Sequence, residues 1–172
     1  MGTVAAMGPS EVSLHEATVQ DVEALIDALY AAANWHGRAS FGRDEVMRRP
    51  ELAHYVAGWP RAGDFGTVAT LDDRPVGAAW CRTFPAEDPG YGFVGPDVPE
   101  ISVGVEGTRR GRGIGSSLLA ALMAQARTHG CTAVSLSVED ENPARAMYRR
   151  QGFVVVGRNG NSDTMRLDLP TG

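Results

Sequence analysis

The sequence predicts a mixed α/β protein built on one central sheet, and three observations lead to this fold class. Runs with the two-residue alternation of strands and runs with the 3.6-residue spacing of helices follow one another along the chain. Their order is β-α-α-β-β-β-α-β-α-β-β, with a right-handed crossover expected around the long third helix. No internal repeat or low-complexity linker divides the 172 residues, a length that suits a single core.

The N-terminal part of the chain predicts one strand and two helices. "SLHEAT" at 13–18 is typical of a strand, and Thr18 and Asp21 have the spacing of a capping box at the start of a helix. Residues 43–59 predict a second helix that Pro50 breaks. The apolar stripe of the first helix consists of Val22, Leu25, Ile26, Leu29 and Tyr30.

The middle of the chain predicts a hairpin, a loop and a short strand. Two β-rich runs in residues 65–84 flank the turn sequence "DDRP", and residues 85–99 are dense in Pro, Gly and Asp. "EISVGV" at 100–105 predicts the strand. Alternation places Ile101, Val103 and Val105 on one of its faces and Glu100, Ser102 and Gly104 on the other.

The C-terminal part predicts a long helix, a strand, a short helix and a final hairpin. Gly130 is expected to cap the long helix, and residues 131–139 read as the strand. The short helix spans 142–152 with Pro143 in its first turn, and 153–169 forms a hairpin that bends at "NGN". The stripe of the long helix consists of Ile114, Leu118, Leu119, Leu122, Met123 and Ala126.

Domain organisation and setting are expected to be simple. We expect residues 1–11 to form a flexible tail, without the features of a signal peptide, and residues 12–170 to form one domain. No apolar run approaches the roughly 18 residues that a membrane span needs. We therefore expect a cytoplasmic protein that does not bind a membrane.

Composition excludes several classes of chemistry. All 16 basic residues are arginine, so neither a Walker-type phosphate lysine nor a Schiff-base lysine is present. The net charge of −5 argues against a nucleic-acid partner. We expect Cys81 and Cys131 to be buried small hydrophobes, and the four scattered histidines predict no metal site.

The stretch "RRGRGIGSSLLAAL" at 109–122 predicts an anion site. A helix begins there, and a helix N-terminus exposes unpaired N–H groups with a partial positive charge. Gly111, Gly113 and Gly115 let a ligand approach the backbone and allow positive φ angles. Added donors come from Arg109, Arg110, Arg112, Ser116 and Ser117. The segment is therefore predicted to hold a pyrophosphate.

Two other interpretations of this stretch stay open on the residues alone. Glycine-rich turns between a strand and a helix also occur without a ligand, and arginines also occupy solvated loops. "GRGIGS" is similar to a dinucleotide fingerprint, with Glu139 as the later acidic residue. The N-terminal half, however, does not show the repeated βαβ pattern that such a site requires.

Two segments resemble the GNAT superfamily of N-acetyltransferases. "EISVGVEGTRRGRGIGSSLLAAL" is similar to its acetyl-CoA segment, whose signature Gln/Arg-x-x-Gly-x-Gly/Ala is matched by Arg110, Gly113 and Gly115. "ENPARAMYRRQGF" is similar to the family's second segment, which carries Tyr148. The order of elements also matches over residues 12–169. Two departures are Glu106-Gly107 in place of a common Asp-Pro, and the position of Asn142, one place later than in many members.

The resemblance implies a fold and a cosubstrate. The fold is a mostly antiparallel sheet splayed around acetyl-CoA, whose acetyl group passes directly to an amine without a metal. Backbone groups of Val103 and Val105 would bond the pantetheine arm as an added strand, with a bulge at Gly104 splaying the strands. The pyrophosphate would lie on N–H groups of Arg110, Gly111, Arg112, Gly113, Ile114, Gly115 and Ser116.

The resemblance also implies two catalytic residues. Glu100 resembles the family's strand carboxylate and would accept the proton of the amine, and Tyr148 would donate to the departing thiolate. A backbone N–H near Val103 would stabilise the oxyanion. Alternatives to Glu100 as the base stay open: a water bound by Ser102, or the loop residues Glu87, Asp88 and Tyr91.

The acceptor is expected to be an amine on a small molecule, a peptide or a protein, next to the first helices. Trp35, Tyr55 and Tyr91 are the candidate wall, with His36, His54 and Trp59 beside them, although aromatic packing alone also explains such residues. We expect a monomer or homodimer. The alternative function is a non-catalytic acyl-CoA-binding or regulatory module on the same fold.

Overall fold

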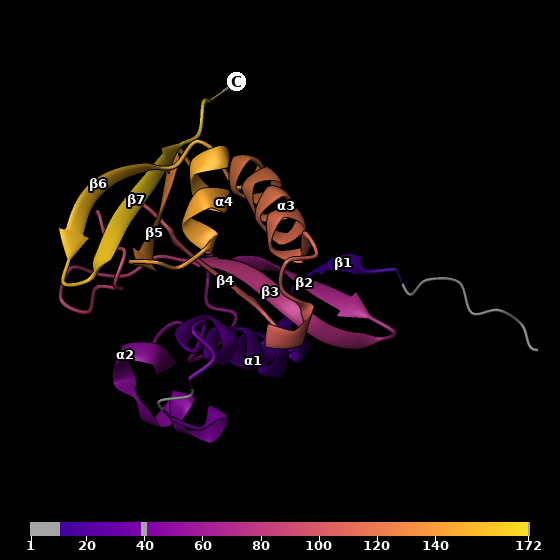
Figure 1. Ribbon diagram of the computed structural model, residues 1–172. Helices are drawn as coiled ribbons and strands as arrows, with labels where there is room; N and C mark the ends of the chain where they lie inside the picture. The colour runs from indigo at the N-terminus through magenta and orange to yellow at the C-terminus, as the bar shows by residue number, and fades with distance from the viewer. Residues whose placement is uncertain (1–10, 39–40, 172) are drawn as a thin grey trace, which may run out of the picture.

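The computed structural model describes residues 11–38 and 41–171, and its strands form a seven-stranded mixed sheet with helices on both faces (Figure 1). The sheet order is β1-β2-β3-β4-β5-β7-β6, and neighbouring strands are antiparallel except for β4 and β5. The predicted fold class and element order are confirmed. Most of the predicted tail lies outside the described residues.

The strands lie close to where alternation predicts them. Their bounds are β1 Ser13–Glu16, β2 Phe65–Leu71, β3 Arg74–Arg82, β4 Glu100–Val105, β5 Ala133–Glu139, β6 Val154–Asn159 and β7 Ser162–Asp168. The β2–β3 hairpin turns at Asp72 and Asp73, which both have positive φ, and the β6–β7 hairpin turns at Gly160 and Asn161. The loop predicted over 85–99 contains no helix or strand.

The long helices also match their predicted stripes. The helices are α1 Val22–Ala33, α2 Pro50–Ala53, α3 Ile114–Thr128 and α4 Ala144–Arg150, with 3-10 turns at Val19–Asp21, Arg43–Arg48 and Gly107–Arg109. The predicted capping box is confirmed: Thr18 N–H donates to Asp21 at 2.8 Å. Gly130 follows the α3 C-cap with φ of 73°, and the N–H of Cys131 reaches back to the carbonyl of Ala126 at 2.9 Å.

The prediction of one broken helix over 43–59 is wrong in extent. Residues Arg43–Arg48 form a 3-10 helix, α2 is only four residues long, and turns follow it. Pro50 begins α2 instead of interrupting a helix, because proline fits the first turn while it forces Arg49 before it into an extended conformation (ψ 107°).

Two hydrophobic clusters hold the helices on opposite faces of the sheet. Leu118, Leu119 and Leu122 of α3 pack with Ile101 and Leu136 on one face, where α4 also lies (Figure 1). Leu25 and Leu29 of α1 pack with Val68 and Trp80 on the other. The predicted faces of β4 are therefore confirmed: its valines face α3, Gly104 meets α1, and Glu100, on the same face as Gly104, contacts Tyr55.

The expected bulge at Gly104 is wrong. The β3–β4 ladder passes through the pair Ala78 and Gly104 without a register shift. The glycine is needed for a different reason: a Cβ built at Gly104 would lie 1.8 Å from the carbonyl oxygen of Ala28. Because no side chain fits there, α1 packs directly on the backbone of β4.

Candidate active site

The site begins where β4 and β5 separate. The two parallel strands share one paired position, Glu100 opposite Ser135, and the Ser135 N–H donates to the Pro99 carbonyl at 3.0 Å. The Pro99 carbonyl thus points toward β5. Backbone groups of alternate residues point to the same side of a strand, so those of Val103 and Val105 also point to this side, into the gap. In this gap a cavity of about 940 Å³ opens.

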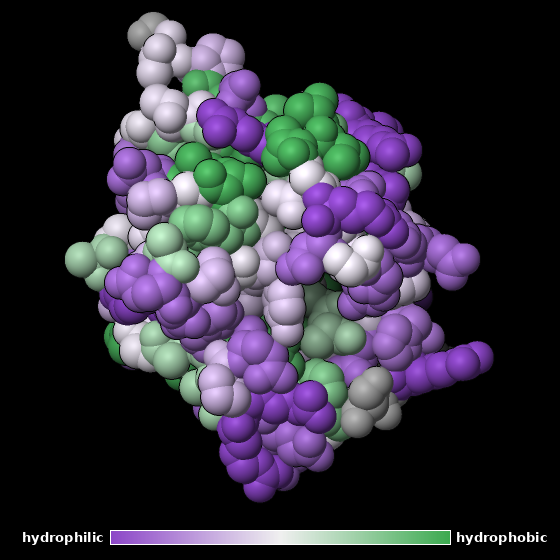
Figure 2. Space-filling model, turned by 90° about the vertical axis from the view of Figure 1, so that its left-hand side faces the viewer, coloured by the Kyte–Doolittle hydropathy of each residue, from purple (hydrophilic) through white to green (hydrophobic). Residues whose placement is uncertain are grey.

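The cavity reaches from α2 and the β6–β7 turn to the start of α3. Figure 2 views the side of the molecule that carries β6 and α2, and shows a hollow with apolar surface at its floor and hydrophilic groups around it. Most predicted site residues line the cavity: Trp35, Tyr55, Tyr91, Glu100, Val103, Val105, Arg110, Gly111, Gly113, Ile114, Gly115, Ser116 and Tyr148. Arg112 does not line it and is exposed.

The N-terminus of α3 is an uncapped set of donors inside this cavity. Gly111 and Gly113 have φ of 74° and 81°, which confirms the prediction of positive φ at these glycines. No side chain caps α3, so the first N–H groups of the helix are left for a ligand. In the described part of the chain nothing lies within 4 Å of a Cβ built at Gly111 or Gly113, and this open backbone suits a phosphate group.

Arg110 makes different contacts from those predicted for its guanidinium. Its Nη1 donates to the Trp35 carbonyl at 2.5 Å and its Nη2 to the Ala31 carbonyl at 2.7 Å, while Nε donates to the Val105 carbonyl at 3.3 Å. The guanidinium therefore fastens the C-terminal end of α1 to the end of β4. A phosphate at α3 would meet the backbone of Arg110, not its side-chain fork.

Glu100 is a buried carboxylate with one satisfied oxygen. Its Oε1 accepts hydrogen bonds from the Tyr55 hydroxyl at 2.7 Å and from the Gly92 N–H at 2.9 Å. Its Oε2 is buried without a hydrogen-bond partner among the described residues. Burial outweighs the two hydrogen bonds and raises the pKa of Glu100 from 4.5 to about 7. A group with this pKa can exchange a proton near neutral pH.

The loop before β4 encloses Glu100. A Cβ built at Gly90 would lie 1.9 Å from Oε2 of Glu100, and one at Gly92 would lie 2.4 Å from the backbone carbon of Leu136. The two glycines on either side of Tyr91 therefore let the loop press against the carboxylate and β5. Of the rival bases in this loop, Asp88 contacts His54 Nδ1 at 3.1 Å instead, and neither Glu87 nor Asp88 lines the cavity.

Tyr55 connects Glu100 of β4 with the loop that carries Tyr91, a role that the sequence did not reveal. Its hydroxyl donates to Glu100 and accepts from the Tyr91 N–H at 2.8 Å. Burial and the Glu100 charge raise the pKa of Tyr55, so it keeps its proton. Its ring stacks with that of Tyr91, with centroids 6.4 Å apart.

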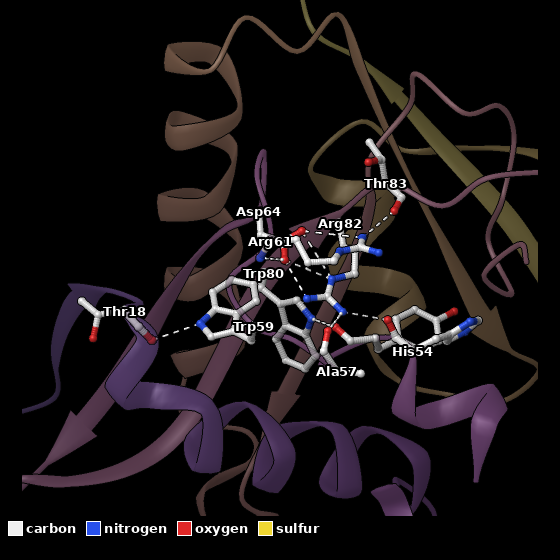
Figure 3. A network of polar contacts seen from close by, with 10 residues as sticks. Thr18, His54, Ala57, Trp59, Arg61, Asp64, Trp80, Arg82 and Thr83 are labelled. Atoms are coloured by element: carbon white, nitrogen blue, oxygen red, sulfur yellow. Dashed lines mark hydrogen bonds and ion pairs between the residues drawn. The ribbon is translucent and has the colours of Figure 1, made fainter.

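A buried ion pair holds the segment that carries Tyr55 (Figure 3). Arg82 lies opposite Glu100 in the β3–β4 ladder, but its guanidinium turns to Asp64 at 2.6 Å and to the carbonyls of His54 and Ala57, both at 2.8 Å. Because this nearby cation is already paired, Glu100 has no cationic partner among the described residues.

Tyr148 comes to the cavity from α4. It is 7% exposed and packs against Phe153 with ring centroids 5.8 Å apart. Burial raises the pKa of Tyr148 to about 12, and its hydroxyl has no hydrogen-bond partner among the described residues. It can therefore serve as a donor to a group in the cavity, as well as a core residue.

Sequence reasoning missed four charged residues of the cavity. Arg49, Glu51, Glu139 and Arg150 line it, but charged residues at the ends of helices and strands are typical of solvated surfaces. Across the described ranges, no group of three or more His, Cys, Asp or Glu side chains is placed to hold a metal ion, and none of the described helices has the length and hydropathy to cross a membrane.

Comparison with known proteins gives a consistent result. A model described as the acetyltransferase (GNAT) family matches residues 26–153. The chain is 31% identical over 127 residues to the L-2,4-diaminobutyric acid acetyltransferase of Nocardia farcinica, covering 62% of this chain and 65% of the relative. It is 31% identical over 147 residues to the mycothiol acetyltransferase of Clavibacter sepedonicus, covering 84% of this chain and 43% of the relative. The chain therefore spans less than two thirds of either relative.

A solved structure shows the same fold. The PaiA N-acetyltransferase of Thermoplasma acidophilum, in complex with coenzyme A, superposes with a TM-score of 0.64. The match covers 92% of this chain and 99% of that chain, at 14% sequence identity.

We predict that one glutamate titrates near pH 7, because burial raises the pKa of Glu100 to about 7. Side-chain carbon NMR of glutamate-labelled protein would follow it, and the signal should vanish in Glu100→Gln. Tyr55→Phe should move the midpoint upward, since the Tyr55 hydrogen bond lowers this pKa. Tyr30→Phe, on α1 and outside this cavity, should leave it in place. A Glu100 midpoint near pH 4 would contradict this description.

Proposed function

The chain belongs to the GNAT family of acetyltransferases, and on that premise we propose that it transfers the acetyl group of acetyl-CoA directly to a primary amine. One observation carries the proposal: a free strand edge, an uncapped helix N-terminus and a buried carboxylate of pKa about 7 meet in one cavity. The relatives named as acetyltransferases and the coenzyme A complex of similar fold support it.

The described residues fit the cosubstrate. When bound, acetyl-CoA supplies an activated acetyl thioester. The backbone of Val103 and Val105 faces the gap between β4 and β5, where an extended pantetheine arm would complete the ladder. The N–H groups at Gly113 to Ser116 would hold the pyrophosphate at the positive end of α3.

Glu100 is proposed as the base. An alkyl ammonium has a pKa of about 10, so the acceptor must lose a proton before its nitrogen can attack. The unpartnered Oε2 of Glu100 accepts this proton, directly or through a water. A backbone N–H near Val103 would hold the oxyanion. Tyr148, which keeps its proton, would donate a hydrogen bond to the sulfur as it leaves.

The acceptor is proposed to be a small molecule or a peptide bearing a primary amine. The printed names of the relatives make 2,4-diaminobutyrate the first acceptor to test. The cytoplasmic setting, the absence of a metal and of a nucleic-acid partner, and the monomeric or homodimeric state stay predictions.

We predict that acetyl-CoA raises the melting temperature of the protein, whereas ATP and NAD do not, because only acetyl-CoA binds the native site. In a thiol-release assay, an amine panel with 2,4-diaminobutyrate, polyamines, amino acids and peptides should give turnover with at least one acceptor. Stabilisation by acetyl-CoA without release of the coenzyme A thiol in the presence of any amine would favour the non-catalytic module. Absence of stabilisation would contradict the proposal altogether.

We predict that Tyr148→Phe lowers kcat roughly 10- to 100-fold, the effect of one hydrogen bond to a charged atom. Acetyl-CoA binding, measured by calorimetry, should change little because the phenol ring and its packing remain. Unchanged kcat would leave Tyr148 as a core residue only.

A further inference from the structure

Arg49 presents hydrogen-bond donors to the cavity that no described residue takes up. It precedes α2 and lines the cavity, with its guanidinium carbon 4.4 Å above the centroid of the Phe41 ring. The nearest carboxylate oxygens, on Glu45 and Glu51, are both 3.7 Å away. This distance is beyond hydrogen-bond range. Arg49 therefore stacks on the Phe41 ring, forms only loose ion pairs, and keeps the N–H donors of its guanidinium available.

The position of Arg49 separates it from the phosphate end of the cavity. The other lining arginines of the described chain are Arg109, Arg110 and Arg150. They belong to the segment before α3 and to α4, whereas Arg49 directly precedes α2. The predicted pyrophosphate site uses the segment before α3, so Arg49 is left for the acceptor.

Two stacked rings connect the surroundings of Arg49 with Glu100. Tyr55 bonds Glu100, and the Tyr91 ring stacks on Tyr55 at 6.4 Å. Tyr91 in turn lies within electrostatic reach of Arg49, Glu51 and Glu139. Arg49 and Glu100 therefore line one cavity and are linked through Tyr91 and Tyr55.

Resting on the proposed function, we propose that Arg49 binds a carboxylate of the acceptor, which is therefore an amine that also carries a carboxylate group. A guanidinium matches the two oxygens of a carboxylate in a planar fork, and Phe41 supports it from below. Glu51 and Glu139, both near Tyr91, favour a second positive charge such as the α-ammonium group.

The test compares acids with their carboxamides, because amidation removes the carboxylate charge, and the comparison between variants cancels any other effect of the amide. The probes are 2,4-diaminobutyrate and ornithine with their carboxamides. The variants are Arg49→Gln and the matched control Arg48→Gln, whose exposed side chain does not line the cavity. Wild type and Arg48→Gln should prefer the acids by about tenfold in kcat/KM, mainly through KM. Arg49→Gln should lose this preference while it keeps its activity on the amides and its KM for acetyl-CoA.

A second measurement does not depend on turnover. Calorimetry on the coenzyme A-saturated protein should show acid binding about tenfold weaker in Arg49→Gln than in Arg48→Gln. If no amine causes release of the coenzyme A thiol but this difference in binding persists, the proposed function is contradicted and the carboxylate site is supported. Equal kcat/KM for acid and amide in the wild type, or an equal loss on both in Arg49→Gln, would overturn the role of Arg49.

Discussion

The divergence of β4 from β5 after a single paired position is the constraint on which the site depends. Two strands of one sheet normally satisfy each other's N–H and C=O groups, and buried groups without partners are costly. Here the ladder stops at Glu100 and Ser135, and the edge of β4 at Val103 and Val105 faces a cavity. The sheet thus holds open a place for an extended ligand, with a buried carboxylate where the opening begins.

Both faces of the sheet support this opening. On one face, α3 begins without a cap at the cavity and is fixed by its leucines in the core. On the other, α1 reaches the backbone of β4 because Gly104 has no side chain, and Arg110 ties the end of α1 to the same place. The Arg82–Asp64 pair holds the segment of Tyr55 against β3, so Glu100 receives a phenol donor and no cation.

The sequence predicts the parts of this structure that depend on local signals. Strand alternation, helical stripes, the capping box at Thr18 and the glycines before α3 are encoded within a few residues, and the structure confirms them. The contacts of Tyr55 with Glu100 and of Gly104 with Ala28 join residues far apart in the chain, so no local pattern reveals them. The same holds for Arg110, whose charge suggested a phosphate although its donors bind carbonyls at the end of α1 and of β4.

The central claim is that coenzyme A lies on main-chain amides of the β4 edge and of the α3 start. Amide hydrogen exchange, resolved by residue and measured with and without coenzyme A, tests this directly. We expect exchange to slow at Val103, at Val105 and across 113–116, with little change in β1 or β6. Slowing confined to other segments, or no slowing with coenzyme A bound, would contradict the account.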